Sequence, residues 1–266
     1  MAKVHVTPPF SPNGQETKPI QRQTSWITLV PTEQWTVYCR AIEAVRAAGI
    51  RFMIGGAFGL ACYIGRWRNT KDLDLYVLPS DRDAAVAALT KAGFSDFYDQ
   101  LNYDRRWIYR SEKDGIIVDV IFAMANLRTS VEEDWFEYAI SVMLKDEELA
   151  PLPPEELLWC KLYVLQRDRC DWPDVMNLLY AVGPQLDWPR LLRRVADDKP
   201  LLAGLMSVFR WISPEKAELL PQWVWNNVCE PADEPVDDAT LRRRIALLDA
   251  RPWFAAHQPT DEPLRL

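Results

Sequence analysis

The first regular hydrophobic pattern of the chain follows a polar leader. Residues 1–24 are rich in Pro, Gln, Ser and Thr and contain few large apolar side chains. Such a segment can bury little apolar surface, so we predict a flexible leader over residues 1–28. After Pro31, apolar residues return every three or four positions, which predicts a helix with Thr32 as its cap and Gly49 at its end.

Residues 51–124 alternate between strand-like and helix-like patterns. RFMI at 51–54 predicts a short strand, and the apolar run AFGLACYIG predicts a helix after it. KDLDLYVLPS at 71–80 alternates polar and apolar positions, as strands do. A further helix is expected over DRDAAVAALTKAGF, with Ser80 as its cap and Gly93 at its end. RRWIYRS and GIIVDVIFAM then predict a hairpin around the turn EKDG.

A proline-rich stretch divides the chain into two parts. KDEELAPLPPEEL carries three prolines, and only helical patterns follow it. We therefore predict an α+β fold, with a small mixed-sheet domain and flanking helices over residues 29–148 and an all-helical domain over residues 149–266. The last helix of that domain is expected over Leu241 to Leu248.

Composition and charge exclude several classes of function. The chain has 266 residues, 48% of them hydrophobic, which is enough to bury a substantial core. Its net charge of -7 and pI near 5.1 argue against strong generic binding of nucleic acid. The five cysteines form no CxxC pair, so zinc is not expected. Neither a membrane span nor a secretory signal is visible, so we expect no membrane contact and a cytoplasmic protein with reduced thiols.

Three aspartates fall on predicted strands. Asp72 and Asp74 are two positions apart, so their side chains project to the same face of one strand. Asp119 interrupts the apolar run IIVDVIF, where an unpaired ionised side chain is costly. If the two strands are neighbours, three carboxylates converge, and divalent cations that prefer oxygen relieve their repulsion. The sequence therefore predicts a site for Mg²⁺ or Mn²⁺ at these three residues.

A glycine pair supplies the second half of the predicted site. Gly55 and Gly56 stand where the strand RFMI turns into the following helix. Because they have no side chains, backbone amides and the helix dipole can face a triphosphate there. Two metal ions about 4 Å apart, held by the aspartates, then fit the two-metal template for in-line transfer to a hydroxyl group.

The order of these motifs resembles the DNA polymerase β-type nucleotidyltransferase superfamily. The resemblance rests on IGGAFGLACYIGRWRNTKDLDLYVL and VDVI, and it covers residues 50–179 as motifs. Within the superfamily, RWRNTKDLDL is similar to the toxin-like branch typified by the abortive-infection AbiEii proteins and to uncharacterised bacterial nucleotidyltransferases. One departure is that fifteen residues separate Gly56 from Asp72, which is slightly long for the superfamily and affects the expected local geometry.

The resemblance also implies a role for each matching residue. EELLWCKLYVLQRDRCDWPDVMNLL is similar to a helix that carries a phosphate-contacting lysine in these families. The metal ligands would be Asp72, Asp74 and Asp119, the phosphate-facing turn Gly55 and Gly56, and the further nucleotide-binding residues Arg68, Thr70, Lys161 and Asp174. Asp119 would also accept a proton from the acceptor, and the helical domain would contact the acceptor or nucleotide.

Each motif also has an interpretation without a catalytic role. A Gly-Gly pair alone is usually a turn, Asp-x-Asp alone is often a solvated strand face, and Lys161 on an amphipathic helix is more often a surface residue. The order of the motifs favours an Mg²⁺-dependent nucleotidyltransferase that moves an NMP from an NTP to a hydroxyl acceptor and releases pyrophosphate. The alternatives are a catalytically silent nucleotide-binding or interaction protein with this fold, and an RNA-binding protein. The acceptor stays open between a small molecule, RNA and a protein.

Overall fold

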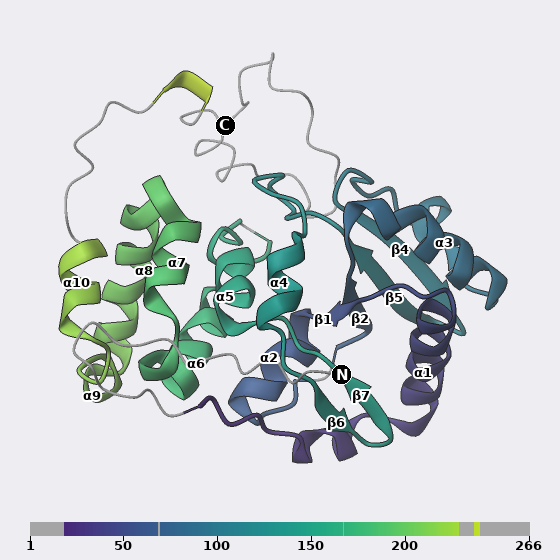
Figure 1. Cartoon of the computed structure of the whole chain (residues 1–266), viewed down its shortest axis with the longest axis horizontal. Coiled ribbons are helices and arrows are strands. Elements are labelled where there is room, and N and C mark those ends of the chain that lie inside the picture. The colour runs from purple at the N-terminus through teal and green to yellow at the C-terminus, as the bar shows by residue number, and fades with distance from the viewer. Residues whose placement is uncertain (1–18, 69, 167, 229–236, 240–266) are drawn as a thin grey trace.

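The chain folds into a sheet-bearing part followed by a helical part (Figure 1). The computed structural model describes residues 19–68, 70–166, 168–228 and 237–239. The sheet-bearing part contains the 3-10 helix η1 (Ser25–Leu29), α1 (Thr32–Ala47), β1 (Met53–Ile54), α2 (Gly56–Ile64), β2 (Asp72–Tyr76), η2 (Pro79–Asp81), α3 (Arg82–Lys91), β3 (Ser95–Asp96), η3 (Phe97–Asp99), β4 (Ile108–Lys113), β5 (Ile116–Ile121), α4 (Glu133–Tyr138), β6 (Val142–Leu144) and β7 (Glu147–Leu149). The helical part contains α5 (Pro154–Leu162), α6 (Trp172–Val182), η4 (Gly183–Gln185), α7 (Trp188–Val195), η5 (Ala196–Asp198), α8 (Lys199–Ile212), α9 (Pro214–Ala217) and α10 (Gln222–Val228).

The central sheet has five strands in the order β1-β2-β5-β4-β3. β2 and β5 are parallel, and all other neighbours in this sheet are antiparallel. A parallel pair needs a long connection, and α3 with the strands after it provides that connection. The mixed sheet and the helical part that follows it confirm the predicted α+β fold class.

The predicted hairpin is present as β4 and β5. The two residues of its turn, Asp114 and Gly115, have φ values of 55° and 76°, which is the left-handed region that a two-residue Asp-Gly turn requires. The register that follows from this turn pairs Arg110 with Asp119 across the two strands. A short turn thus sets which side chain lies beside the predicted third aspartate.

The predicted helix ends are confirmed, but two predicted caps are wrong. Gly49 and Gly93 follow α1 and α3 with φ values of 75° and 87°, a conformation that glycine adopts at low cost. Thr32 is the first residue of α1 and not the residue before it, because a proline occupies that position. Ser80 lies within η2, and α3 begins at Arg82 with Asp81 before it, one residue further along the chain than predicted.

The end of the predicted leader is part of the core, which corrects the prediction of a flexible segment up to residue 28. Trp26 and Ile27 are buried, and Trp26 stacks on Trp67 with ring centroids 5.2 Å apart. The Gln23 amide donates a hydrogen bond to the Cys62 carbonyl at 2.7 Å. Apolar side chains in SWITL explain this packing, whereas residues 1–18 of the predicted leader lie outside the described residues.

Helices α1 and α3 cover one face of the central sheet, and the predicted aspartates of β2 lie on the opposite face. α1 and α3 contact each other and β5, and Leu73 and Leu75 of β2 are fully buried. The alternate residues of β2 project to the opposite face, toward the helical part of the molecule. α2 joins the two parts, because it contacts β2 as well as α5 and α6 (Figure 1).

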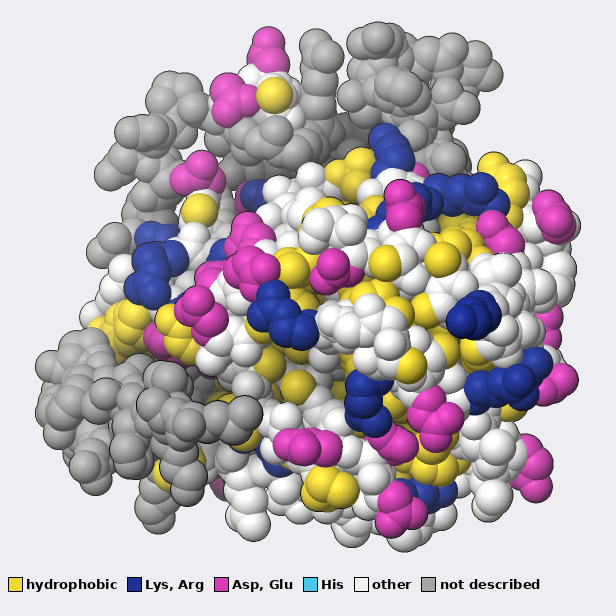
Figure 2. Space-filling view, turned by 45° about the vertical axis from the view of Figure 1, so that its right-hand side comes forward, with side chains coloured by type: hydrophobic (Ala, Val, Ile, Leu, Met, Phe, Trp, Pro, Cys, Tyr) yellow, Lys and Arg dark blue, Asp and Glu magenta, His cyan; other side chains and the backbone are white. Residues whose placement is uncertain are grey.

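Four further predictions concern the last helix, the domain boundary, membrane spans and the charge of the surface. The helix expected at 241–248 lies outside the described residues, and the boundary between residues 148 and 149 stays a prediction. In the described part of the chain, every helix is too short or too polar to span a bilayer. Basic and acidic side chains are interspersed on the face shown in Figure 2.

Candidate active site

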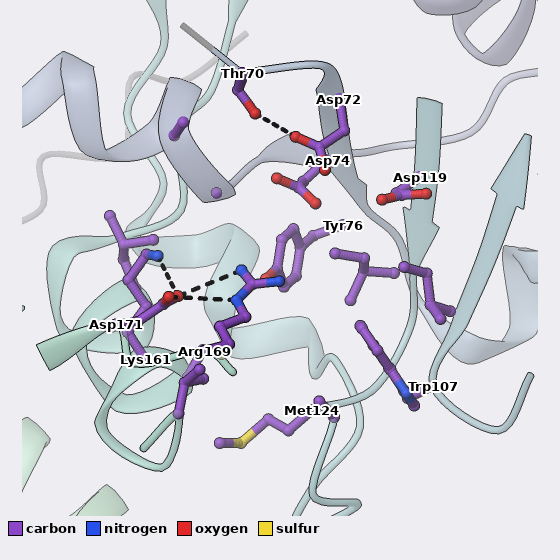
Figure 3. A pocket seen from close by; sticks show the side chains of 18 of the residues that line it. Thr70, Asp72, Asp74, Tyr76, Trp107, Asp119, Met124, Lys161, Arg169 and Asp171 are labelled. Atoms are coloured by element: carbon purple, nitrogen blue, oxygen red, sulfur yellow. Dashed lines mark hydrogen bonds and ion pairs between the residues drawn. The ribbon is translucent and has the colours of Figure 1, made fainter. Parts of the chain in front are cut away.

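Strand pairing brings the three predicted aspartates together at one pocket. Asp74 lies opposite Asp119 in the parallel ladder of β2 and β5, and Asp72 projects to the same face two residues earlier. The pocket has a volume of about 100 Å³, and Figure 3 shows the three carboxylates along one side of it. The side chain of Asp119 is 1% exposed and that of Asp72 is 31% exposed. The convergence expected from the sequence is therefore present in the fold.

The glycine pair lies directly against the carboxylate strand. A Cβ built on Gly56 would overlap an Asp74 carboxylate oxygen and lie 2.7 Å from Asp74 Cγ, and a Cβ on Gly55 would overlap the Tyr76 ring. The Gly55 amide already donates to the Asp74 carbonyl at 3.0 Å. The first turn of α2, which begins at Gly56, therefore offers its amides at the pocket, whereas the Gly55 amide is used by β2.

Burial and mutual repulsion set the electrostatics of the aspartates. Burial raises the pKa of Asp74 to about 8, and the nearby carboxylates of Asp72 and Asp119 add to the rise. Burial also raises the pKa of Asp119 to about 6, although the Arg110 guanidinium opposes that rise. This is an arrangement in which added positive charge stabilises the ionised carboxylates.

Arg110 of β4 is a site residue that the sequence reasoning missed. Its Nε donates to Asp119 Oδ1 at 2.9 Å and its Nη2 to Asp119 Oδ2 at 2.5 Å. Nη2 also lies 3.4 Å from Asp72 Oδ2. The signal was present in the sequence, because a two-residue turn at Asp114 and Gly115 places Arg110 opposite Asp119.

Cationic side chains from the helical part form the opposite wall of the pocket. Lys161 of α5 donates to Asp171 at 2.6 Å and to Asp174 at 2.9 Å, and it is buried, so the interpretation as a surface lysine is wrong. Arg169 donates to both oxygens of Asp171 at 3.3 and 3.4 Å, and Figure 3 shows its guanidinium between that wall and Asp74. Arg169 is a second residue that the sequence did not predict at the site, because its loop has no regular pattern.

Two other predicted residues, Arg68 and Thr70, form contacts with aspartates at the pocket. The Thr70 hydroxyl donates to the Asp72 carboxylate, and Arg68 forms an ion pair with Asp174 at 3.1 Å. Arg68 and Thr70 both line the pocket. Asp174 thereby joins Arg68 to Lys161, which is a positioning contact between α6, α5 and the segment before β2.

The donor set of the pocket fits a divalent cation at two of the three aspartates. Asp72 and Asp74 provide the oxygen ligands that Mg²⁺ and Mn²⁺ prefer. Among the residues that the structure describes, no side chain donates a hydrogen bond to Asp74 or forms an ion pair with it, although it is partly buried and repelled by Asp72 and Asp119. Across the same described ranges, no three His, Cys, Asp or Glu side chains are placed to hold a metal together.

The far end of the pocket is apolar. Trp107 and Met124 line it beyond the carboxylates, and both are buried against the core (Figure 3). These side chains come from the segments that flank the β4–β5 hairpin. The pocket thus combines a carboxylate wall, a cationic wall and an apolar end, as sites for polar molecules with an organic ring commonly do.

A family described as uncharacterised nucleotidyltransferase matches residues 40–205. That range contains the whole carboxylate strand, the glycine pair and both walls of the pocket. No protein of curated function matches the chain in sequence.

Several solved structures are similar to this chain. The solution structure of the antibiotic-resistance factor ANT(2'')-Ia is 17% identical, with a TM-score of 0.48, over 68% of this chain and 100% of that chain. The lincosamide antibiotic adenylyltransferase LnuA is 14% identical, with a TM-score of 0.40, over 56% and 96%. An antigenic nucleotidyltransferase-like protein from Paracoccidioides brasiliensis is 14% identical, with a TM-score of 0.46, over 77% and 100%.

Proposed function

The chain belongs to the uncharacterised nucleotidyltransferase family, and we propose that it is a magnesium-dependent enzyme that moves an NMP from an NTP to a hydroxyl acceptor. The observation that carries the proposal is the position of Asp74 against the first turn of α2, with Asp72 on the same face of β2. A helix N-terminus attracts phosphate, and buried carboxylates attract the cation that accompanies a polyphosphate. Lys161 and Arg169 face them from the opposite wall.

Mg²⁺ or Mn²⁺ would be held by Asp72 and Asp74, with Asp119 beside them. When bound, the cation would supply positive charge that lowers the pKa of a hydroxyl group and offsets the negative charge of pyrophosphate. The protein groups orient the polyphosphate, because the amides at the start of α2 and the two cations of the helical part converge on it from different sides. Tyr76 supports this arrangement by packing against Gly55.

The proposed reaction forms one bond and breaks another at the α-phosphorus. The acceptor oxygen bonds to that phosphorus while the bond from the phosphorus to the bridging oxygen breaks, and pyrophosphate leaves with the electron pair. The hydroxyl proton needs a base, and Asp119 is the carboxylate that we assign to this role. Its partner Arg110 favours the ionised form, which is the form that accepts a proton.

A small-molecule, RNA or protein hydroxyl fits this reaction equally, so the first experiment uses the nucleotide alone. It measures thermal unfolding of the full chain with each NTP, in Mg²⁺ and in EDTA. A ligand at a hundredfold excess over its dissociation constant stabilises a protein by about 2.7 kcal/mol. We expect such a shift with at least one NTP in Mg²⁺, its loss in EDTA, and its loss in Asp74→Asn.

A matched variant separates the site from general effects of charge. Asp83→Asn makes the same substitution at an exposed residue of α3 and should keep the full Mg²⁺-dependent shift. Absence of a shift with every NTP would favour the alternative of a silent scaffold or interaction protein. An Mg²⁺-dependent shift that is retained in Asp74→Asn would contradict the assignment of Asp72 and Asp74 as ligands of the cation.

A further inference from the structure

The β4–β5 register places a fixed positive charge inside the predicted carboxylate cage. Asp74, Asp119 and Arg110 lie side by side on neighbouring strands, because β5 pairs Asp119 with Asp74 on one side and with Arg110 on the other. Cross-strand neighbours at the same register project to the same face of a sheet. Arg110 therefore lies among the carboxylates as a consequence of the backbone pairing and not of a side-chain rotamer alone.

The contacts of Arg110 use both oxygens of Asp119. Two donors of the guanidinium reach the two carboxylate oxygens at 2.9 and 2.5 Å, and the nearer donor also lies 3.4 Å from Asp72. A paired arrangement of this kind is the strongest hydrogen-bonded contact between arginine and a carboxylate. The guanidinium stays protonated at any ordinary pH, so the positive charge does not leave when a cation approaches.

Burial makes the pair difficult to open. The side chain of Arg110 is 7% exposed and that of Asp119 is 1% exposed. Separation of the pair would take its main charge partner from the buried Asp119 carboxylate, which is strongly unfavourable. Asp72 and Asp74 differ, because Asp72 is partly exposed and, among the described residues, no side chain forms a hydrogen bond or ion pair with Asp74.

We propose that Arg110 keeps Asp119 from coordinating a metal ion. A single divalent cation then binds to Asp72 and Asp74, and the guanidinium of Arg110 occupies the place where a cage of three carboxylates would hold a second ion. This inference rests on the proposed function, since it concerns the cation of that same site. Asp119 then acts beside the ion and not as its ligand. Arg110 is a positioning residue, because it acts through Asp119.

The test measures Mn²⁺ binding to the full chain without nucleotide, from the loss of the free-ion EPR signal during titration. Wild type should bind a single Mn²⁺, and Asp74→Asn should lose it. Arg110→Gln should gain a second Mn²⁺, because Asp119 becomes available and a positive charge is removed. The double variant R110Q/D119N should return to a single ion with the affinity of wild type.

Controls and contrary outcomes separate this inference from the proposed function. Arg82→Gln, on the distant helix α3, should leave Mn²⁺ binding unchanged. A fall in Mn²⁺ affinity of about tenfold or more in R110Q/D119N would make Asp119 a ligand and overturn the inference. A second Mn²⁺ in wild type, or no gain in a folded Arg110→Gln, would do the same.

The double variant decides the question even if Arg110→Gln does not fold by circular dichroism. It removes both charges together, and such neutral replacements of a buried pair are often tolerated. Retention of Mn²⁺ binding in Asp74→Asn would overturn the proposed function itself. Absence of Mn²⁺ binding by wild type would overturn both.

Discussion

Gly56 begins α2 directly over the carboxylate of Asp74. A Cβ on Gly56 would lie 2.7 Å from Asp74 Cγ, which real Cβ atoms essentially never approach. Gly56 also has a φ of 52°, in the left-handed region that other residues adopt at a cost. One glycine therefore lets the first turn of α2 lie directly against the carboxylate of Asp74.

Gly56→Ala should abolish the Mg²⁺-dependent thermal shift with NTP. The added methyl group must displace Asp74 or the first turn of α2, and the backbone strain costs about 1–2 kcal/mol of stability. Gly49→Ala is the control, because Gly49 has a φ of 75° but a Cβ there would meet no atom within 4 Å. Loss of NTP binding in both variants would contradict a local effect at the site.

Arg169→Gln should weaken NTP binding by about tenfold, which is the loss of a charge-assisted hydrogen bond. Arg169 lines the pocket opposite Asp74, so its guanidinium is placed to meet the polyphosphate. Calorimetric titration of NTP in Mg²⁺ measures the change. The control is Arg46→Gln, an exposed residue of α1 paired with Glu147, which should bind NTP like wild type. If Arg169→Gln bound NTP with the affinity of wild type, the phosphates of the NTP would not contact Arg169.

Glu156 of α5 should make stability depend on pH. Its carboxylate is buried, and burial raises the pKa from 4.5 to about 7, although Arg190 and Arg194 oppose the rise. Between these two values the folded protein binds a proton that the unfolded chain has released, so stability falls as pH rises through this window. A shift of this size corresponds to about 3 kcal/mol.

Urea unfolding at pH 5 and pH 8 checks this prediction. Glu156→Gln cannot ionise, so its stability should fall less than that of wild type over this interval. Glu215→Gln, at an exposed position of α9, should follow wild type. Parallel pH curves for wild type and Glu156→Gln would indicate that the two arginines keep Glu156 ionised throughout.

Trp26→Ala should destabilise the protein by about 3–5 kcal/mol, because it removes a large aromatic side chain from the core. Trp26 is 3% exposed, stacks on Trp67 and contacts the edge of Phe58. Trp211→Ala is the control, since Trp211 is 83% exposed and should change stability by about 0.5 kcal/mol or less. Similar losses of stability in the two variants would indicate that the segment around Trp26 is not part of the core.

Much of the carboxylate side of the site was predictable because it depends on local rules. The alternation of β2 places Asp72 and Asp74 on one face whatever surrounds them. The Asp-Gly turn closes the hairpin that carries Asp119. The glycine pair marks the start of α2 because a residue with a side chain would collide there.

The end of the leader and the cationic wall were not predictable in the same way. Trp26 stands in a short apolar run with no partner in its own sequence neighbourhood, and its partner Trp67 is far along the chain. Lys161 has the spacing of a surface residue, but α6 brings Asp171 and Asp174 against it. Burial of this lysine depends on helix packing, which residue spacing does not encode.

The sequence by itself determined the α+β class, the strand that presents two aspartates, and the hairpin that presents the third, because backbone periodicity and turn conformation are local properties. Only the tertiary structure decided that β2 and β5 are neighbours, that Arg110 binds Asp119 from the other side, and that Lys161 and Arg169 complete the pocket. These contacts join segments far apart in the chain. Their energies come from burial and charge pairing, which exist once the segments have packed.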